Sequence, residues 1–149
     1  MPFRLALCSG SAWLTAAVLV VAACTVMPIP ARAQWSPTTP CDSKPSTAEQ
    51  SQCLEKALRQ ADAGLNTAYQ RAMRIIDADP DSAPAQRAAW RHALQAAQRS
   101  WIAFRDADCG EITGYEWHQG TGMGPATLAC SLDKTLQRSR ELTARYASN

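Results

Sequence analysis

The chain has 149 residues, of which 46% are hydrophobic and 19% charged, and its formal net charge at pH 7 is +2. Two of its 15 basic residues, Arg4 and Arg32, lie in a segment that we expect to be removed, whereas none of its 13 acidic residues does. The formal charge of residues 34–149 is therefore zero. This balance argues against nucleic-acid binding, which needs a surplus of clustered Lys and Arg, and a chain of this length predicts a single domain.

Residues 1–33 have the pattern of a signal peptide. A mainly apolar run without charge covers residues 14–27 and is shorter than the roughly 20 apolar residues that a membrane-spanning helix requires. Ala31-Arg32-Ala33 supplies a small-x-small cleavage site, so we expect a periplasmic or secreted protein that keeps no transmembrane span. The alternative is a lipoprotein, because Val21-Ala22-Ala23-Cys24 also fits a lipobox with a lipid anchor at Cys24.

Either cut leaves the same four downstream cysteines, namely Cys41, Cys53, Cys109 and Cys130. An even number of cysteines in a small exported domain indicates two disulfides. Their spacing contains no Cys-x-x-Cys motif of the kind that binds zinc, so we expect no metal site.

The first predicted elements are an extended arm and a long helix. Residues 34–45 are rich in Pro, Ser and Thr, which predicts the arm. Ser46 stands three residues before Glu49, the spacing of a capping box that begins a helix. Apolar residues then recur three and four positions apart, and Asp79-Pro80 ends the helix.

A second helix is predicted from a cap at Asp81 or Ser82 to about Glu111. Trp90, Trp101 and Phe104 continue the apolar spacing, so we expect all three in the core.

The glycine-rich segment 114–124 predicts a loop, and Pro125 suits the first turn of a third helix. No segment has the alternating pattern of a strand. The short link at 79–82 makes the first two helices an antiparallel hairpin. The predicted fold is an all-α three-helix bundle with two disulfides, in which the long antiparallel hairpin of the first two helices dominates.

The hairpin also makes a prediction about the disulfides. Folding about residue 81 places Cys53 level with Cys109, and the arm and third helix bring Cys41 and Cys130 to the same end. We therefore favour Cys53–Cys109 with Cys41–Cys130. The pairing Cys41–Cys53 with Cys109–Cys130 remains open.

Three motifs resemble a known family. They are Thr47-x-Glu49-x-x-x-Cys53, Ala61-Asp62-x-x-Leu65-Asn66-x-x-Tyr69 and Ala97-Gln98-x-x-Trp101-x-x-Phe104-Arg105-Asp106-x-x-Cys109. With the glycine loop, Cys130, Thr135, Arg138 and Leu142, they resemble the LprI-like lysozyme-inhibitor family (DUF1311) over residues 41–145. The resemblance implies an exported helical domain at residues 46–149 and a lysozyme inhibitor rather than an enzyme. Lys134 departs from the pattern, because the family often has an apolar residue there.

Two sets of polar residues share helical faces: Asp62, Asn66 and Tyr69 on the first helix, and Gln98 and Arg105 on the second. We interpret them as a polar network that fixes the register of the helices. Its predicted members are Asp62, Asn66, Tyr69, Gln98, Arg105, Thr135 and Arg138. The alternative interpretation is a ligand cleft lined by Asp62, Asn66, Arg105 and Arg138.

Acidic residues gather near the end of the second helix, where the helix dipole disfavours negative charge. Such a cluster suits a cationic partner, and chicken-type lysozymes are strongly basic. The candidate contact residues are Asp106, Asp108, Glu111, Glu116, Trp117 and His118. The alternative is a solvated acidic surface with Asp106 paired locally.

Catalysis finds little support in the sequence. His92 and His118 have no carboxylate or nucleophile at motif spacing, and we expect no cofactor. Two functions remain: an exported binding protein that inhibits lysozyme, or a structural or envelope-associated protein that binds another cationic protein or a cell-wall component and inhibits nothing.

Overall fold

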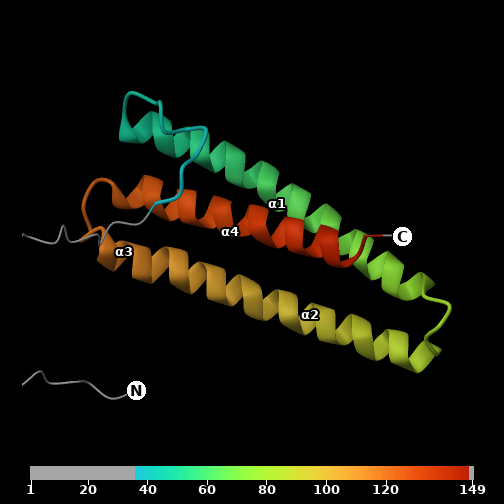
Figure 1. Cartoon of the computed structure of the whole chain (residues 1–149). Coiled ribbons are helices and arrows are strands. Elements are labelled where there is room, and N and C mark those ends of the chain that lie inside the picture. Colours follow the sequence, from blue (N-terminus) through green and yellow to red (C-terminus); the bar gives the residue numbers. More distant parts are fainter. Residues whose placement is uncertain (1–35, 148–149) are drawn as a thin grey trace, which may run out of the picture. The chain divides into compact units, whose positions relative to one another are not determined.

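The computed structural model describes residues 36–147 (Figure 1). The predicted signal peptide and Cys24 lie outside the described residues. The elements in chain order are α1 (Thr47–Ala78), α2 (Pro84–Ala107), the π-helix η1 (Asp108–Ile112), α3 (Thr113–Glu116) and α4 (Met123–Arg145). The described part of the chain contains no strand, and the prediction of an all-α fold with three long helices and two disulfides is confirmed.

The start of α1 follows the predicted capping box. The Ser46 hydroxyl accepts a hydrogen bond from the backbone N–H of Glu49 at 3.2 Å and donates one to the Glu49 carboxylate at 2.8 Å. These bonds satisfy a backbone donor that has no partner within the helix. The apolar stripe of α1 buries seven residues: Leu54, Ala61, Leu65, Ala68, Ala72, Met73 and Ile76.

The core lies mainly between α1 and α4, which run in the same direction, with α2 antiparallel to both (Figure 1). Near the start of the two helices, Leu54 of α1 shares a cluster with Leu132 of α4. Farther along, Ile76 shares a second cluster with Leu142 and Tyr146. α1 and α2 form the predicted antiparallel hairpin. The hairpin does not dominate the core, however, because the main apolar partner of α1 is α4.

α2 buries a single residue, Leu94. Trp101 packs against the core from a partly buried position. The expectation of core positions for Trp90 and Phe104 is wrong, since 42% and 55% of their surfaces are exposed. Both aromatic rings meet neighbours at the edge of the bundle instead: Trp90 lies 6.2 Å from the ring of Tyr146, and the Lys134 ammonium lies 4.9 Å from the ring of Phe104.

The link between α1 and α2 is held by a basic side chain rather than by the predicted caps. Arg87 donates hydrogen bonds to the carbonyl of Asp79 at 3.1 Å and to the carbonyl of Ser82. The N-cap of α2 is Ala83, whose N–H donates to the side-chain oxygen of Gln86 at 2.9 Å. The expectation of a cap at Asp81 or Ser82 is thus not met.

The disulfides join Cys41 to Cys53 and Cys109 to Cys130, with Cα–Cα distances of 5.8 and 5.5 Å. The favoured pairing is wrong, and the alternative that the sequence left open is the one observed. The physical reason is the packing order: α1 packs mainly against α4 rather than against α2, so equal height along the hairpin does not bring Cys53 to Cys109.

The arm reaches Cys53 through a tight turn. The Asp42 carboxylate accepts hydrogen bonds from the Thr39 hydroxyl at 2.6 Å and from the Thr39 backbone N–H at 2.9 Å. These two bonds, the hydroxyl first, lower the pKa of Asp42 below its ordinary value of 3.8. The turn places Cys41, which is fully buried, against α1.

Candidate functional site

The last two residues of α2 and the chain that joins α2 to α4 make up a segment that we call the tip (residues 106–122). In it, the π-helix η1 follows α2 directly and continues into α3. Cys109 is buried there and ties η1 to α4 through Cys130. The Thr113 hydroxyl donates to the carbonyl of Asp108 at 3.3 Å. The predicted loop 114–124 is therefore helical at its start, and α4 begins two residues before Pro125. Single π-helical turns occur frequently at functional sites.

The second part of the tip is a turn that needs a glycine. His118 and Gln119 have φ values of 51° and 57°, in the left-handed region that few residues adopt. The indole of Trp117 lies against Gly122 so closely that a Cβ at position 122 would be 2.4 Å from the ring. Trp117 therefore packs inward, with its Nε1 buried and without a hydrogen-bond partner among the described residues, while His118 is exposed.

The four acids of the tip have different surroundings. Lys134 of α4 pairs with Asp108 at 2.9 Å, and Arg105 pairs with Asp106 at 3.0 Å. Glu111 is exposed and Glu116 is partly exposed, and neither forms an ion pair within the described part of the chain. The uncompensated negative charge therefore lies on η1 and α3.

The same stretch exposes two large apolar side chains. Tyr115 is 73% exposed and Ile112 is 51% exposed. Ile112 directly follows Glu111 in the sequence, and Tyr115 directly precedes Glu116. The tip thus combines an exposed aromatic residue, an aliphatic residue and unpaired carboxylates on a segment tied to α4 by a disulfide.

A polar cluster connects the three long helices above the tip. The Nη1 atom of Arg105 (α2) donates to the Asp62 carboxylate (α1) at 3.1 Å and to the Thr135 hydroxyl (α4) at 3.1 Å. Thr135 is fully buried, so this bond satisfies a hydroxyl that water does not reach. The arrangement connects residues that the sequence placed in one polar network.

A second cluster surrounds Arg138 of α4. Its Nε donates to the Gln98 side chain (α2) at 3.2 Å, and its Nη1 pairs with Glu141 at 2.8 Å. Asp62 is therefore bonded to Arg105, while the carboxylate bonded to Arg138 is that of Glu141. Sequence reasoning missed Glu141, although its spacing of three residues from Arg138 on one helix was an available signal.

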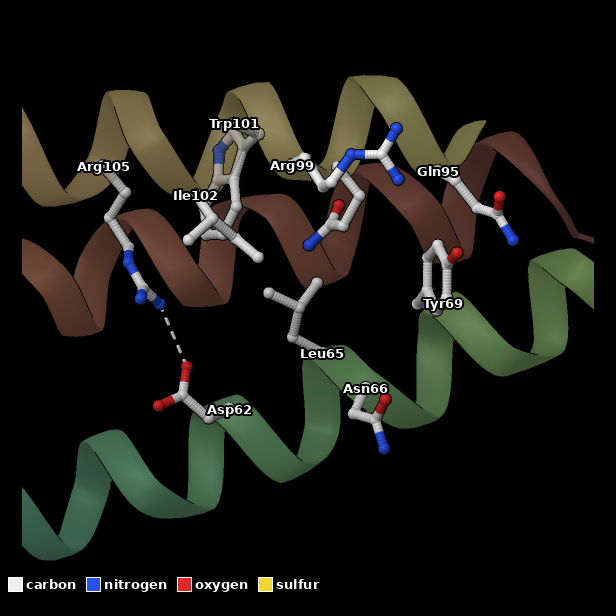
Figure 2. Close-up of a pocket in the computed structure, with 10 residues that line it drawn as sticks. Asp62, Leu65, Asn66, Tyr69, Gln95, Arg99, Trp101, Ile102 and Arg105 are labelled. Carbon is white, nitrogen blue, oxygen red and sulfur yellow. Dashed lines mark hydrogen bonds and ion pairs between the residues drawn. The ribbon is translucent and has the colours of Figure 1, made fainter. Parts of the chain in front are cut away.

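Asn66 and Tyr69 belong to neither cluster. They line a groove of about 650 Å³ between α1 and α2, with α4 behind it (Figure 2). The groove is lined by Asp62, Leu65, Asn66, Tyr69, Gln95, Gln98, Arg99, Trp101, Ile102 and Arg105.

A grouping of possible metal ligands occurs at Asp108, Cys109 and Cys130. Both sulfurs are consumed in the disulfide and so cannot act as thiolate ligands. With these cysteines oxidised, the site offers one carboxylate that is already paired with Lys134.

The family model for the lysozyme inhibitor LprI matches residues 41–142. The chain belongs to the LprI family. The matched range contains all four cysteines, both polar clusters and the whole tip. An uncharacterized protein of Rhizobium meliloti (strain 1021) is 34% identical over 116 residues, covering 76% of this chain and 82% of that protein. No solved structure matches this LprI-family chain.

Among residues 36–147, none of the helices has the length and apolar character needed to cross a membrane. Two disulfides in a small LprI-family domain fit an exported protein.

Proposed function

We propose that this LprI-family protein is a non-enzymatic, exported inhibitor of a basic lysozyme, and that it contacts the enzyme through the tip. The observation that carries the proposal is the exposure of Tyr115 beside the uncompensated carboxylates of Glu111 and Glu116. The family match supports the choice of lysozyme as the target.

The chemistry of the tip suits this role. Interfaces draw most of their binding free energy from a few anchors, among which Tyr is enriched. Unpaired carboxylates steer a cationic partner towards the anchor and raise the association rate. The Cys109–Cys130 disulfide holds the segment in place before binding, which reduces the entropy lost on association.

Three of the predicted contact residues are less suited to binding a partner, because they already have contacts within the protein. Asp106 and Asp108 already have basic partners, and Trp117 packs against Gly122. We therefore assign the contact to Ile112, Tyr115 and His118 together with Glu111 and Glu116. Trp117 supports the tip from within.

The test is inhibition of hen-type lysozyme by the oxidised protein and by three variants. Tyr115→Ala removes the anchor and is expected to weaken inhibition by at least about 30-fold. Glu111→Gln with Glu116→Gln is expected to weaken it by about tenfold at low salt, with less effect at high salt. The control, Glu55→Gln with Asp81→Asn, removes two exposed acids elsewhere and is expected to leave inhibition unchanged.

Inhibition that survives both tip variants would assign the contact to another surface. A folded, oxidised protein that inhibits no lysozyme at micromolar excess would support the alternative function instead. That alternative is an envelope-associated protein with another partner, and the groove between α1 and α2 is the feature that favours it.

A further inference from the structure

The groove between α1 and α2 is a second surface, separate from the tip. None of its lining residues belongs to residues 106–122. Figure 2 shows side chains from both helices converging over α4, with Leu65 and Trp101 in the middle of the groove. A volume of about 650 Å³ falls within the range typical of sites for small molecules.

Two aromatic residues give the groove a fixed apolar surface. Tyr69 of α1 and Trp101 of α2 are partly buried and pack against the core cluster. The remaining parts of the rings line the groove. Rings held in this way offer an apolar face together with a polar atom at low entropic cost. The flat C–H face of a pyranose ring stacks on such a surface.

Polar groups without protein partners surround the aromatic residues. The side-chain amides of Asn66 and Gln95 and the hydroxyl of Tyr69 form no hydrogen bond within residues 36–147. An amide presents both a donor and an acceptor, which is what hydroxyl and N-acetyl groups of a sugar require. Gln98 and Arg105, by contrast, are held by Arg138, Asp62 and Thr135 and therefore fix the shape of the groove.

The charge of the groove selects against a basic partner. Its one carboxylate, Asp62, is paired with Arg105. Arg99 is exposed and forms no ion pair within the described residues. The remaining charge is positive, so the groove suits a neutral or anionic ligand. A guanidinium is well shaped to bind a carboxylate through two hydrogen bonds.

From these features we infer that the groove binds a short chain of N-acetylated amino sugars, with Tyr69 and Trp101 stacking on the rings, Asn66 and Gln95 bonding their polar substituents, and Arg99 bonding a carboxylate on the chain. This inference does not depend on lysozyme inhibition, because the tip and the groove share no residue.

The test is a titration of the oxidised protein, followed by NMR of the Trp101 indole and the Asn66 and Gln95 side-chain amides. The two probes are the N-acetylglucosamine tetramer and the disaccharide of N-acetylglucosamine with N-acetylmuramic acid, which carries a carboxylate. We expect saturable shifts of these groups with both probes. Asn66→Ala with Gln95→Ala is expected to weaken binding of both by about tenfold, the effect of losing two or more hydrogen bonds.

Arg99→Gln is expected to affect the affinities for the two sugars differently. It removes the free cation and is expected to weaken binding of the acidic disaccharide about threefold or more while leaving the tetramer unchanged. Gln70→Ala and Arg74→Gln are matched controls on the exposed surface of α1, outside the groove, and are expected to change neither affinity.

Alanine is favourable in helices, so the double variant should remain folded, and its circular dichroism spectrum checks this. The inference is overturned if neither sugar gives saturable shifts, if the double variant binds as tightly as the unaltered protein, or if an acidic peptide such as hexaglutamate occupies the groove more tightly than both sugars. Loss of sugar binding in the double variant with unchanged lysozyme inhibition would separate this site from the tip.

Discussion

The α1–α4 pair and α2 are held in the same bundle by different forces. α1 and α4 share two apolar clusters, whereas α2 buries only Leu94. The position of α2 depends instead on polar contacts, chiefly those of Arg105 and Gln98, and on the disulfide at its end. A helix positioned by a few specific contacts leaves space beside it, and that space is the groove.

The largest expected effect comes from breaking the α1–α4 core. Leu142 is fully buried between these helices, so Leu142→Ala is expected to lower the free energy of unfolding by about 2–5 kcal/mol. Leu136→Ala on the same helix is the control. Because Leu136 is 40% exposed, Leu136→Ala should lower the free energy of unfolding by only about 1 kcal/mol or less. Denaturant unfolding measures both, and equal losses would contradict the assignment of the core.

The next effect comes from the disulfide that holds the end of α2. Replacing Cys109 and Cys130 by alanine opens a loop of 21 residues, which is expected to lower the free energy of unfolding by about 2–4 kcal/mol. Hydrogen exchange should accelerate in η1, α3 and the last turns of α2 before it does in α1 and α4. Uniform acceleration throughout the bundle would show that α2 is not the less stable part.

A smaller effect is expected from the polar contact between the three helices. Arg105→Ala leaves the buried Thr135 hydroxyl without its partner and is expected to cost about 1–3 kcal/mol. Asp62→Asn should cost less than about 1 kcal/mol, because the Asp62 side chain is half exposed and its ion pair is screened by solvent. A double-mutant cycle measured by urea unfolding separates the two contributions. A larger loss for Asp62→Asn would place the main stabilising bond at Asp62 instead.

The smallest effect concerns the arm. The folded pKa of Asp42 is lowered by its bonds to Thr39, so its contribution to the turn is fully present above the unfolded value near 3.8 and is lost as the pH falls through the lowered folded value. The backbone amide resonance of Thr39, followed by NMR from pH 7 to pH 2, should shift in that low window. Asp42→Asn should abolish the titration, while α1 and α4 remain unchanged.

The helices were predictable from the sequence, but the partners of those helices were not. Apolar spacing and the Ser46–Glu49 capping box placed α1 within a residue of its observed start. The same spacing assigned Trp90 and Phe104 to the core, because periodicity identifies a stripe but does not say how closely another helix covers it. Once α4 takes the place next to α1, the height argument that paired Cys53 with Cys109 no longer applies.

The polar contacts, like the helix packing, could be predicted only in part from the sequence. The heights of the helices favour Arg138 as the partner of the Asp62 carboxylate, with Arg105 as the second candidate, and the contact that the structure shows is the one with Arg105. The partners Lys134 and Glu141 were missed, since Lys134 stands where an apolar residue was expected and instead meets Asp108 and Phe104. The inward position of Trp117 depends on the absence of a side chain at Gly122, a contact within a loop that no periodic pattern indicates.

The order of the cross-links along the chain has a consequence for biogenesis. Each bridge joins cysteines that are neighbours in the sequence, Cys41 with Cys53 and Cys109 with Cys130. An oxidant that couples thiols in the sequence in which they leave a translocation pore would therefore produce the native bonds directly, and the slow exchange of wrongly matched sulfurs is not required for maturation.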